Sequence, residues 1–479
     1  MQSMFMQITV RVSLIIFILG CLVACGGGSS SVPQAVTPVT AAPVTAAPVT
    51  AVPVTAAPVT PVPVTPAVEP PFVDTVVVNY ILDEFFPNKT FSGMRSLIKP
   101  ANTANPLATS MIDCTILVDE ASLCSFNQLP LLGMTSSAPT IDEVMDRVLV
   151  SHDWMAVRMR EVLALMPPEV LLVMRGMTAI VISYDIRPSF YWQGTGAIYI
   201  DPGRLWLTQA EELTIDTAPD FRQDLGNVFK FLIPARYVVT DDIDLRSLPR
   251  NLDSVSLRMA ALLFHELGHA NDFYPPTQVD QIDRSVPMYR AVLTGSRPST
   301  LLHGSFPLTS TVMHRLARVS FGSETVRAAD QLLTATEVAD IFPLDVASDF
   351  YSYSSQREDF AMLFEETMMY YSFGIARDVA VTNLPEVLES CSQLLVEWGE
   401  RHRIAQPAIS PRAQFTVEAV LPEIAPAVVA TLAALTPKPM LVGQDYCTNI
   451  FQAPSASRAL RQPGSERQAL LPPHFLPYL

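Results

Sequence analysis

The stretch "NLDSVSLRMAALLFHELGHANDF" (251–273) carries the pattern that decides the fold. Its apolar residues recur every three or four positions, which predicts one long helix with a buried stripe. We expect Asp253 or Ser254 as the N-cap, because their side-chain oxygens can accept hydrogen bonds from the first unpaired backbone N–H groups. The stripe consists of Leu257, Ala260, Ala261, Phe264 and Leu267. Gly268 costs about 1 kcal/mol relative to alanine in a helix, so we expect another segment to approach closely there.

Three polar residues on this helix suggest a metal site with a base beside it. His265 and His269 lie four positions apart and project from one face, where both rings can reach a single ion. Neutral imidazole suits zinc, and a catalytic zinc site needs three protein ligands and an open position for a water molecule, whose pKa the ion lowers. Glu266 could then take a proton from that water and deliver it to a leaving amine. The alternative is an inert polar helix face.

The segment "HELGHANDF" (265–273) resembles the zinc-binding helix of the zincin metallopeptidases. It is most similar to the family that includes the catalytic domain of anthrax lethal factor and the Pro-Pro endopeptidases, which carry an Asp where this chain has Asp272. The longer metzincin signature would need a glycine at position 272 and a histidine at position 275, so Asp272 and Pro275 exclude that branch. The resemblance implies an α+β, helix-dominated, zincin-like domain that combines a small mixed sheet, the active-site helix, a second ligand-bearing helix and one zinc ion.

In the resembled family the third ligand is a Glu on a later helix. The segment "DFYSYSSQREDFAMLFEETMMYYSFG" (349–374) contains "EDFA", whose Glu358 matches that ligand. Tyr351 matches a family tyrosine that donates a hydrogen bond to the oxyanion, and Tyr353 is its competitor. The separation of His269 and Glu358, 358 − 269 = 89 residues, is long and implies an insertion over 275–350.

Other acidic residues compete with Glu358 as the third ligand. Glu365 lies two turns further along the same predicted helix, and Glu366 and Asp349 are also candidates. The acidic residue that the family often carries four positions after its ligand is Met362 here. We therefore expect support for a histidine ligand to come from elsewhere in the chain.

The N-terminus resembles that of a bacterial lipoprotein. Residues 1–24 read as a signal peptide, because Arg11 precedes an apolar run that is too short to span a bilayer. The run ends in "LVAC" (22–25), which resembles a lipobox, so Cys25 is the expected lipidation site and Cys21 its weaker competitor. A secretory peptide that is cut elsewhere is the alternative. A lipid anchor would hold the protein in the bacterial cell envelope, and resemblance to other lipoproteins suggests the outer membrane.

Export would place the remaining cysteines in an oxidising compartment. Sequence proximity favours disulfides between Cys114 and Cys124 and between Cys391 and Cys447, although four cysteines allow three connectivities. Four buried free thiols are the alternative.

The remaining sequence pattern divides the chain into segments. We expect a disordered Pro/Val/Thr-rich stalk, an N-terminal extension of unknown role, the metallopeptidase domain and a helical C-terminal region at 25–72, 73–139, 140–384 and 385–479. Further helices are predicted at 140–167, 355–373, 385–402 and 411–435, and strands at 177–186 and 196–208. The segment 196–201 is a candidate edge strand for binding an extended substrate, with an interior strand as the alternative.

Composition narrows the classes of function. The chain has a formal net charge of −16 and 49% hydrophobic residues, which is enough for a substantial core. Its basic residues are scattered and form no predicted basic face, which argues against a nucleic-acid partner. The sequence therefore predicts a membrane-anchored, zinc-dependent endopeptidase that hydrolyses an extracytoplasmic protein or peptide. The alternative is a non-catalytic surface lipoprotein whose zinc site is structural or binds a partner.

Overall fold

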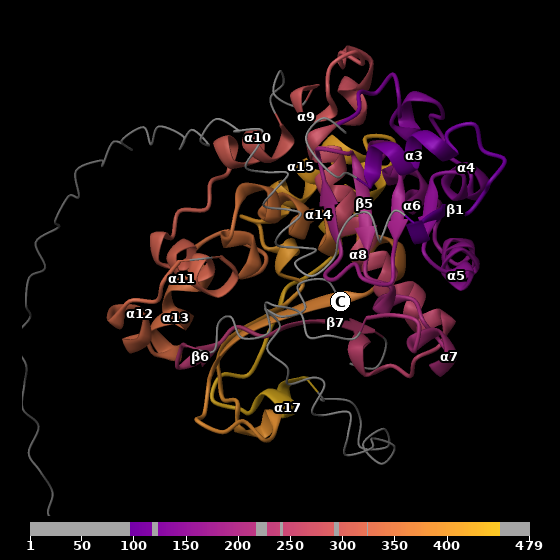
Figure 1. Cartoon of the computed structure of the whole chain (residues 1–479). Coiled ribbons are helices and arrows are strands. Elements are labelled where there is room, and N and C mark those ends of the chain that lie inside the picture. The colour runs from indigo at the N-terminus through magenta and orange to yellow at the C-terminus, as the bar shows by residue number, and fades with distance from the viewer. Residues whose placement is uncertain are drawn as a thin grey trace, which may run out of the picture. The chain divides into compact units, whose positions relative to one another are not determined.

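The computed structural model of the chain describes residues 96–116, 123–216, 228–239, 243–291, 297–322 and 324–450. Over these ranges helices alternate with two small sheets, so the fold is mixed α/β, compatible with the α+β class (Figure 1). No helix in these ranges combines the length and the apolar character that crossing a bilayer requires. The predicted signal peptide, Cys25 and the stalk lie outside the described residues, as do 73–95 and 451–479.

The first sheet has the strand order β1-β2-β3-β5-β4. Its strands are β1 (Lys99–Pro100), β2 (Val148–Val150), β3 (Ile180–Ile182), β4 (Phe190–Trp192) and β5 (Ala197–Ile200). The three inner strands run parallel and all their residues are buried, which is why each is a short unbroken apolar run. The predicted strand at 196–201 is therefore an interior strand, and the antiparallel β4 takes the edge position beside it.

The second sheet is antiparallel and has the order β11-β10-β9-β7-β8, with β6 also paired to β9. Its strands are β6 (Phe231–Leu232), β7 (Ala235–Val239), β8 (Ile243–Asp244), β9 (Ala376–Asn383), β10 (Val396–Arg401) and β11 (Lys438–Pro439). A buried ion-pair group links three of them, because Arg236 and Arg401 reach Asp378 at 2.8 Å and 2.6 Å. This sheet crosses the boundary expected after residue 384.

Two long helices, α8 (Leu252–Phe273) and α14 (Gln356–Phe373), pack against each other at the centre of the fold (Figure 1). Both were predicted. The N-cap of α8 is Asn251 rather than Asp253 or Ser254, and Ser254 supplies the reciprocal half of a capping box. A Cβ at position 268 would lie 3.4 Å from the Ala361 Cα of α14. The expected close approach at Gly268 is thus confirmed.

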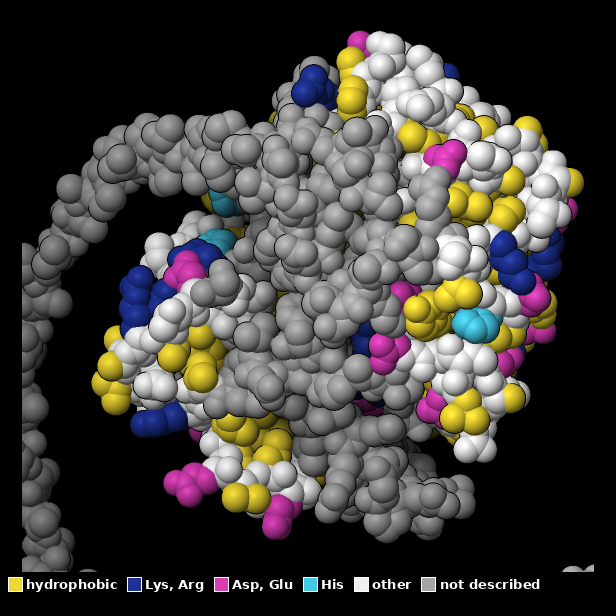
Figure 2. Space-filling model, in the orientation of Figure 1, with side chains coloured by type: hydrophobic (Ala, Val, Ile, Leu, Met, Phe, Trp, Pro, Cys, Tyr) yellow, Lys and Arg dark blue, Asp and Glu magenta, His cyan; other side chains and the backbone are white. Residues whose placement is uncertain are grey.

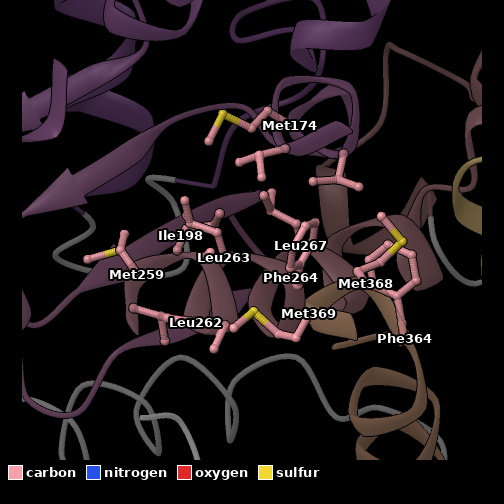
Figure 3. Packing of buried hydrophobic residues seen from close by; sticks show 14 of the residues in the cluster. Met174, Ile198, Met259, Leu262, Leu263, Phe264, Leu267, Phe364, Met368 and Met369 are labelled. Atoms are coloured by element: carbon pink, nitrogen blue, oxygen red, sulfur yellow. The ribbon is translucent and has the colours of Figure 1, made fainter. Parts of the chain in front are cut away.

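Apolar side chains fill the space around these two helices. Phe264 meets Phe364 edge to face, with ring centroids 6.1 Å apart. Figure 3 shows Leu267 and Phe264 beside Phe364 and Met368, with Met174 above them. The largest buried cluster joins α8 and α14 to the parallel strands and to the helices that follow β10. The ligand-bearing helices are therefore held at a fixed separation.

Shorter helices complete the described fold. Those before α8 are α3 (Ala108–Thr115), α4 (Ile141–Met145), α5 (Asp153–Ala164), α6 (Pro168–Val173) and α7 (Gln209–Glu212). The expected insertion contains α9 (Met288–Ala291), α10 (Pro298–Ser305), α11 (Thr311–Phe321), α12 (Ala328–Leu332) and α13 (Ala335–Ile341). After β10 come α15 (Ser410–Val420), α16 (Ala425–Ala433) and α17 (Tyr446–Ile450).

The predicted helix at 140–167 is wrong in part, and the predicted helix at 385–402 is wrong. The segment 140–167 is interrupted by β2, because Val148–Val150 is buried on every side chain as an inner strand rather than on one helical face. The segment 385–402 contains β10, where Gly399 allows Met440 to pack so closely that a Cβ there would lie 2.5 Å from its Sδ. The predicted helix at 411–435 is present as α15 and α16, which are separated around Pro422.

Both predicted disulfides are present. Cys114 is joined to Cys124 and Cys391 to Cys447, with Cα atoms 5.4 Å and 5.2 Å apart. The first bridge lies in the expected N-terminal extension, whose described part packs against the first sheet in one hydrophobic cluster. On the coloured part of the face in Figure 2, basic side chains stand in small separate groups, some of which have acidic side chains beside them.

Candidate metal centre

Three ligand atoms from α8 and α14 converge on one point. His265 Nε2 lies 3.0 Å from His269 Nε2, and Glu358 Oε2 lies 3.2 Å from the first of these atoms and 3.3 Å from the second. The two histidines are brought together by the helical repeat, and the N-cap Ser355 begins α14 so that Glu358 lies in its first turn. These three residues form a group that could hold a metal ion.

The triangle of candidate ligand atoms is close in size to the ligand triangle of a tetrahedral metal site. Zinc binds nitrogen and oxygen ligands at about 2.0–2.2 Å in a tetrahedral arrangement, which places neighbouring ligand atoms about 3.3 Å apart. The observed edges of 3.0, 3.2 and 3.3 Å match that spacing closely. Two imidazoles and one carboxylate also form a donor set that suits zinc better than magnesium or calcium, which prefer oxygen ligands.

A buried carboxylate fixes the orientation of the first histidine. Glu365 Oε2 lies 3.0 Å from His265 Nδ1, and the Tyr237 hydroxyl donates a hydrogen bond of 2.8 Å to the other oxygen of Glu365. Because a carboxylate accepts hydrogen bonds, His265 donates from Nδ1 and directs the Nε2 lone pair toward the triangle. Glu365 thus gives the histidine the support that the sequence analysis expected from a residue other than Met362. The sequence analysis did not identify Glu365 or Tyr237 in this role.

The other acidic residues considered as the third ligand do not lie against both histidine Nε2 atoms. Glu365 contacts the Nδ1 side of His265 and not the triangle. Asp349 accepts hydrogen bonds from the Arg377 guanidinium, the shorter of which is 2.5 Å. Burial raises the pKa of the Glu366 carboxyl to about 8, and the nearby Arg377 offsets only part of that rise. Among the four acidic candidates, Glu358 is the one that lies against both histidine Nε2 atoms.

The charges around His265 favour a cation at the triangle. Burial lowers the pKa of His265, but its hydrogen bonds with Glu358 and Glu365 outweigh this effect and raise the pKa to about 9. Desolvation raises the pKa of the half-buried Glu358 carboxyl, yet the two histidines outweigh this effect and hold that pKa well below the ordinary value. A positive charge, whether a proton or a metal ion, is therefore stabilised where the three atoms meet.

Glu266 lies beside the triangle without belonging to it. Its side chain is buried, and this burial raises the pKa of its carboxyl above the ordinary value against the opposing effect of the two histidines. The same carboxylate accepts a hydrogen bond from the backbone N–H of Tyr191, the middle residue of β4. The candidate base is therefore held between the ligand-bearing helix and the edge strand of the first sheet.

The two candidate tyrosines point in different directions. Tyr351 is half-buried with its ring centroid 6.5 Å from that of His265, and Phe321 at the end of α11 meets it edge to face at 4.8 Å. Tyr353 is fully buried and packs against His314 and Phe342. Tyr351 is thus the one beside the candidate metal centre, and the inserted segment supplies the ring that holds it.

Asp272, the residue that matches the resembled motif, connects α8 to the insertion. Its two carboxylate oxygens accept hydrogen bonds from the Ser299 backbone N–H at 2.6 Å and from the Ser299 hydroxyl at 2.7 Å. Burial raises the pKa of Asp272, which these two bonds oppose. These bonds hold the first turn of α10 against Asp272, which lies three residues after the second histidine.

No family model, curated protein or solved structure matches the chain. The interpretation of the centre therefore rests on its own geometry and donor chemistry.

Proposed function

We propose that the protein is a zinc-dependent endopeptidase of the zincin type, anchored through a lipid on Cys25 to the bacterial cell envelope, where it hydrolyses an extracytoplasmic peptide or protein. The observation that carries the proposal is the triangle of His265 Nε2, His269 Nε2 and Glu358 Oε2, whose edges of 3.0–3.3 Å suit one zinc ion. Zinc in this place would supply a water molecule of lowered pKa and polarise the carbonyl of the scissile peptide bond.

The protein's own groups account for the proton transfers. Glu266 accepts a proton from the attacking water and later donates it to the leaving nitrogen. Its raised pKa makes it a stronger base than an ordinary carboxylate, and the proton that it gains is the one it later delivers. The Tyr351 hydroxyl donates a hydrogen bond to the negative oxygen that develops on the carbonyl.

The exposure of the site is compatible with access by a substrate. The His265 side chain is 0% exposed, whereas the side chains of His269 and Glu358 retain 12% and 21%. Solvent therefore reaches the triangle from the His269 and Glu358 side. Beside it, β4 is an edge strand along which an extended peptide could pair by backbone hydrogen bonds.

The test separates metal binding from turnover. Glu266→Gln should bind zinc as tightly as the wild type but lose roughly 10²–10⁴-fold in turnover, because only the proton transfer is removed. The assay is mass spectrometry of a peptide library after incubation with each zinc-loaded protein. Glu386→Gln, on an exposed loop, is the matched control and should cleave like the wild type. If Glu266→Gln cleaved peptides as fast as the wild type, the proposed role of Glu266 in proton transfer would be wrong.

A further inference from the structure

Two arginines lie near one aromatic ring at the end of α8. Phe273 is the last residue of α8, and its ring centroid lies 5.2 Å from the Arg297 Cζ and 5.7 Å from the Arg357 Cζ. The two guanidinium carbons are therefore at most 10.9 Å apart, the sum of these distances. Both arginines are half-buried, while Phe273 is 9% exposed.

The backbone of each arginine is tied to the candidate metal centre. Arg357 directly precedes the ligand Glu358 in the first turn of α14. Arg297 precedes α10, whose residue Ser299 bonds to Asp272 of α8. Since Asp272 lies three residues after His269, the backbone of both arginines keeps a fixed place relative to the ligand triangle.

The same ring also contacts the edge strand. The rings of Tyr191 and Phe273 are stacked with centroids 6.0 Å apart and planes inclined by 28°. Tyr191 is the residue whose backbone N–H bonds to Glu266. An aromatic surface thus runs from the middle of β4 to the two guanidinium groups.

The distances along the helix indicate which part of a peptide would reach this surface. Phe273 follows His269 by four residues, which corresponds to about 6 Å along an α-helix. Successive residues of an extended peptide are about 3.3 Å apart. For a peptide that runs along the axis of α8, a side chain about two residues from the scissile bond would therefore lie at Phe273.

We propose that Arg297 and Arg357, which both lie near the Phe273 ring, form a subsite for a carboxylate of the substrate. The inference rests on the proposed peptidase function and adds the substrate class: peptides with an acidic residue, or a free C-terminus, about two residues from the cleaved bond. Guanidinium groups bind carboxylates through paired, charge-assisted hydrogen bonds, and they also stack on aromatic rings such as that of Phe273. The subsite has the charge opposite to that of the chain as a whole, which carries −16.

The test measures binding to the zinc-loaded protein, so it does not depend on turnover. The peptides carry a hydroxamate at their N-terminal end to engage the metal, and they differ only in having Asp, Asn or Lys two residues from that group. Each is made with a free and with an amidated C-terminus, which separates a side-chain carboxylate from a terminal one. We expect the carboxylate-bearing peptide to bind roughly tenfold or more tightly than its Asn and Lys counterparts.

The variants distinguish recognition from a structural role. Arg297→Gln/Arg357→Gln should abolish the preference for the carboxylate and leave the affinity for the Asn peptide unchanged within about threefold, and the charge reversal to Glu at both positions should favour Lys. If the double variant does not fold, the single variant Arg357→Gln can be used for the same comparison. Arg160→Gln, whose side chain is 52% exposed on α5, removes the same charge elsewhere and should keep the wild-type preference.

Each remaining outcome overturns the inference in a recognisable way. Equal affinity of the wild type for the acidic and neutral peptides would overturn the subsite and leave the peptidase proposal intact. The inference would also be overturned if the double variant lost equal affinity for the Asp and Asn peptides, because the arginines would then only balance the charge of Asp272. If no hydroxamate peptide binds the zinc-loaded protein, the proposed function fails and the subsite fails with it.

Discussion

Replacing Glu365 with Gln should weaken zinc binding although Glu365 is not a predicted ligand. The side chain is completely buried and its two oxygens hold His265 Nδ1 at 3.0 Å and the Tyr237 hydroxyl at 2.8 Å. Gln has the same shape but no charge, so it makes the His265 Nε2 atom a weaker donor to a metal. Loss of such a supporting group typically lowers metal affinity 10- to 100-fold, or about 1.4–2.7 kcal/mol.

The same substitution has a second expected effect, on the metal-free protein. Glu365 accepts from two buried donors, whereas Gln has one acceptor oxygen and would present its amide nitrogen to the other donor. One donor of Tyr237 or His265 then remains unsatisfied, which costs about 1–3 kcal/mol of the free energy of unfolding. Metal affinity and folding stability should therefore both decrease, and the two effects can be measured separately.

The assay is competition for zinc with a chromophoric chelator, combined with urea unfolding of the metal-free protein. Glu366→Gln is the matched control, because it makes the same substitution at the next buried residue of α14, which lies outside the ligand triangle. Its zinc affinity should equal that of the wild type. If Glu365→Gln binds zinc within a factor of two of the wild type, or if Glu366→Gln is weakened as much, the assigned role of Glu365 is wrong.

The remaining predictions concern the pH dependence of stability, the tyrosines and the helix contact. Burial raises the pKa of Glu366 from 4.5 to about 8, so its contribution to stability is present below pH 4.5 and is lost as the pH rises to 8. Over that range the free energy of unfolding of Glu366→Gln, measured in urea, should rise relative to that of the wild type by on the order of a few kcal/mol. A difference in the free energy of unfolding that does not change with pH would contradict this. Tyr351→Phe should lower kcat by roughly 10²-fold with zinc affinity retained, while Tyr353→Phe should leave kcat unchanged. Gly268→Val should weaken zinc binding by displacing α14, since even a Cβ reaches 3.4 Å from Ala361, whereas Gly268→Ala should bind zinc normally.

The parts of the fold and site that sequence predicts are those determined within one helix. The periodicity of 251–273 determines α8, and the four-residue spacing determines that His265 and His269 share a face. The glycine at 268 signals a close neighbour, because a helix interior disfavours glycine unless packing requires it. Glu358 followed from the resemblance of "EDFA" rather than from periodicity, and the structure brings it to the two rings.

The parts that sequence does not predict depend on what packs against a segment. The apolar residues of 140–167 fit a helical repeat, but Val148–Val150 lies between two other strands and is buried on both faces. In 385–402 the pairing of β10 with β9 overrides a helical pattern. The role of Glu365 is similar: its spacing from Glu358 placed both on one face of α14, but whether it binds a metal or orients His265 depends on which ring nitrogen it meets.

The shape of the ligand triangle favours a divalent cation over a proton as its occupant. A proton on His265 Nε2 can be directed at one acceptor only, and it would leave the lone pair of His269 Nε2 facing the same space 3.0 Å away. The three edges differ by only 0.3 Å, so a single ion can bind all three atoms equally, and its two charges would balance the carboxylates of Glu358 and Glu365. Three ligands leave one tetrahedral position for a water or substrate oxygen. With Glu266 held beside the triangle rather than in it, that arrangement favours a catalytic centre over a structural one.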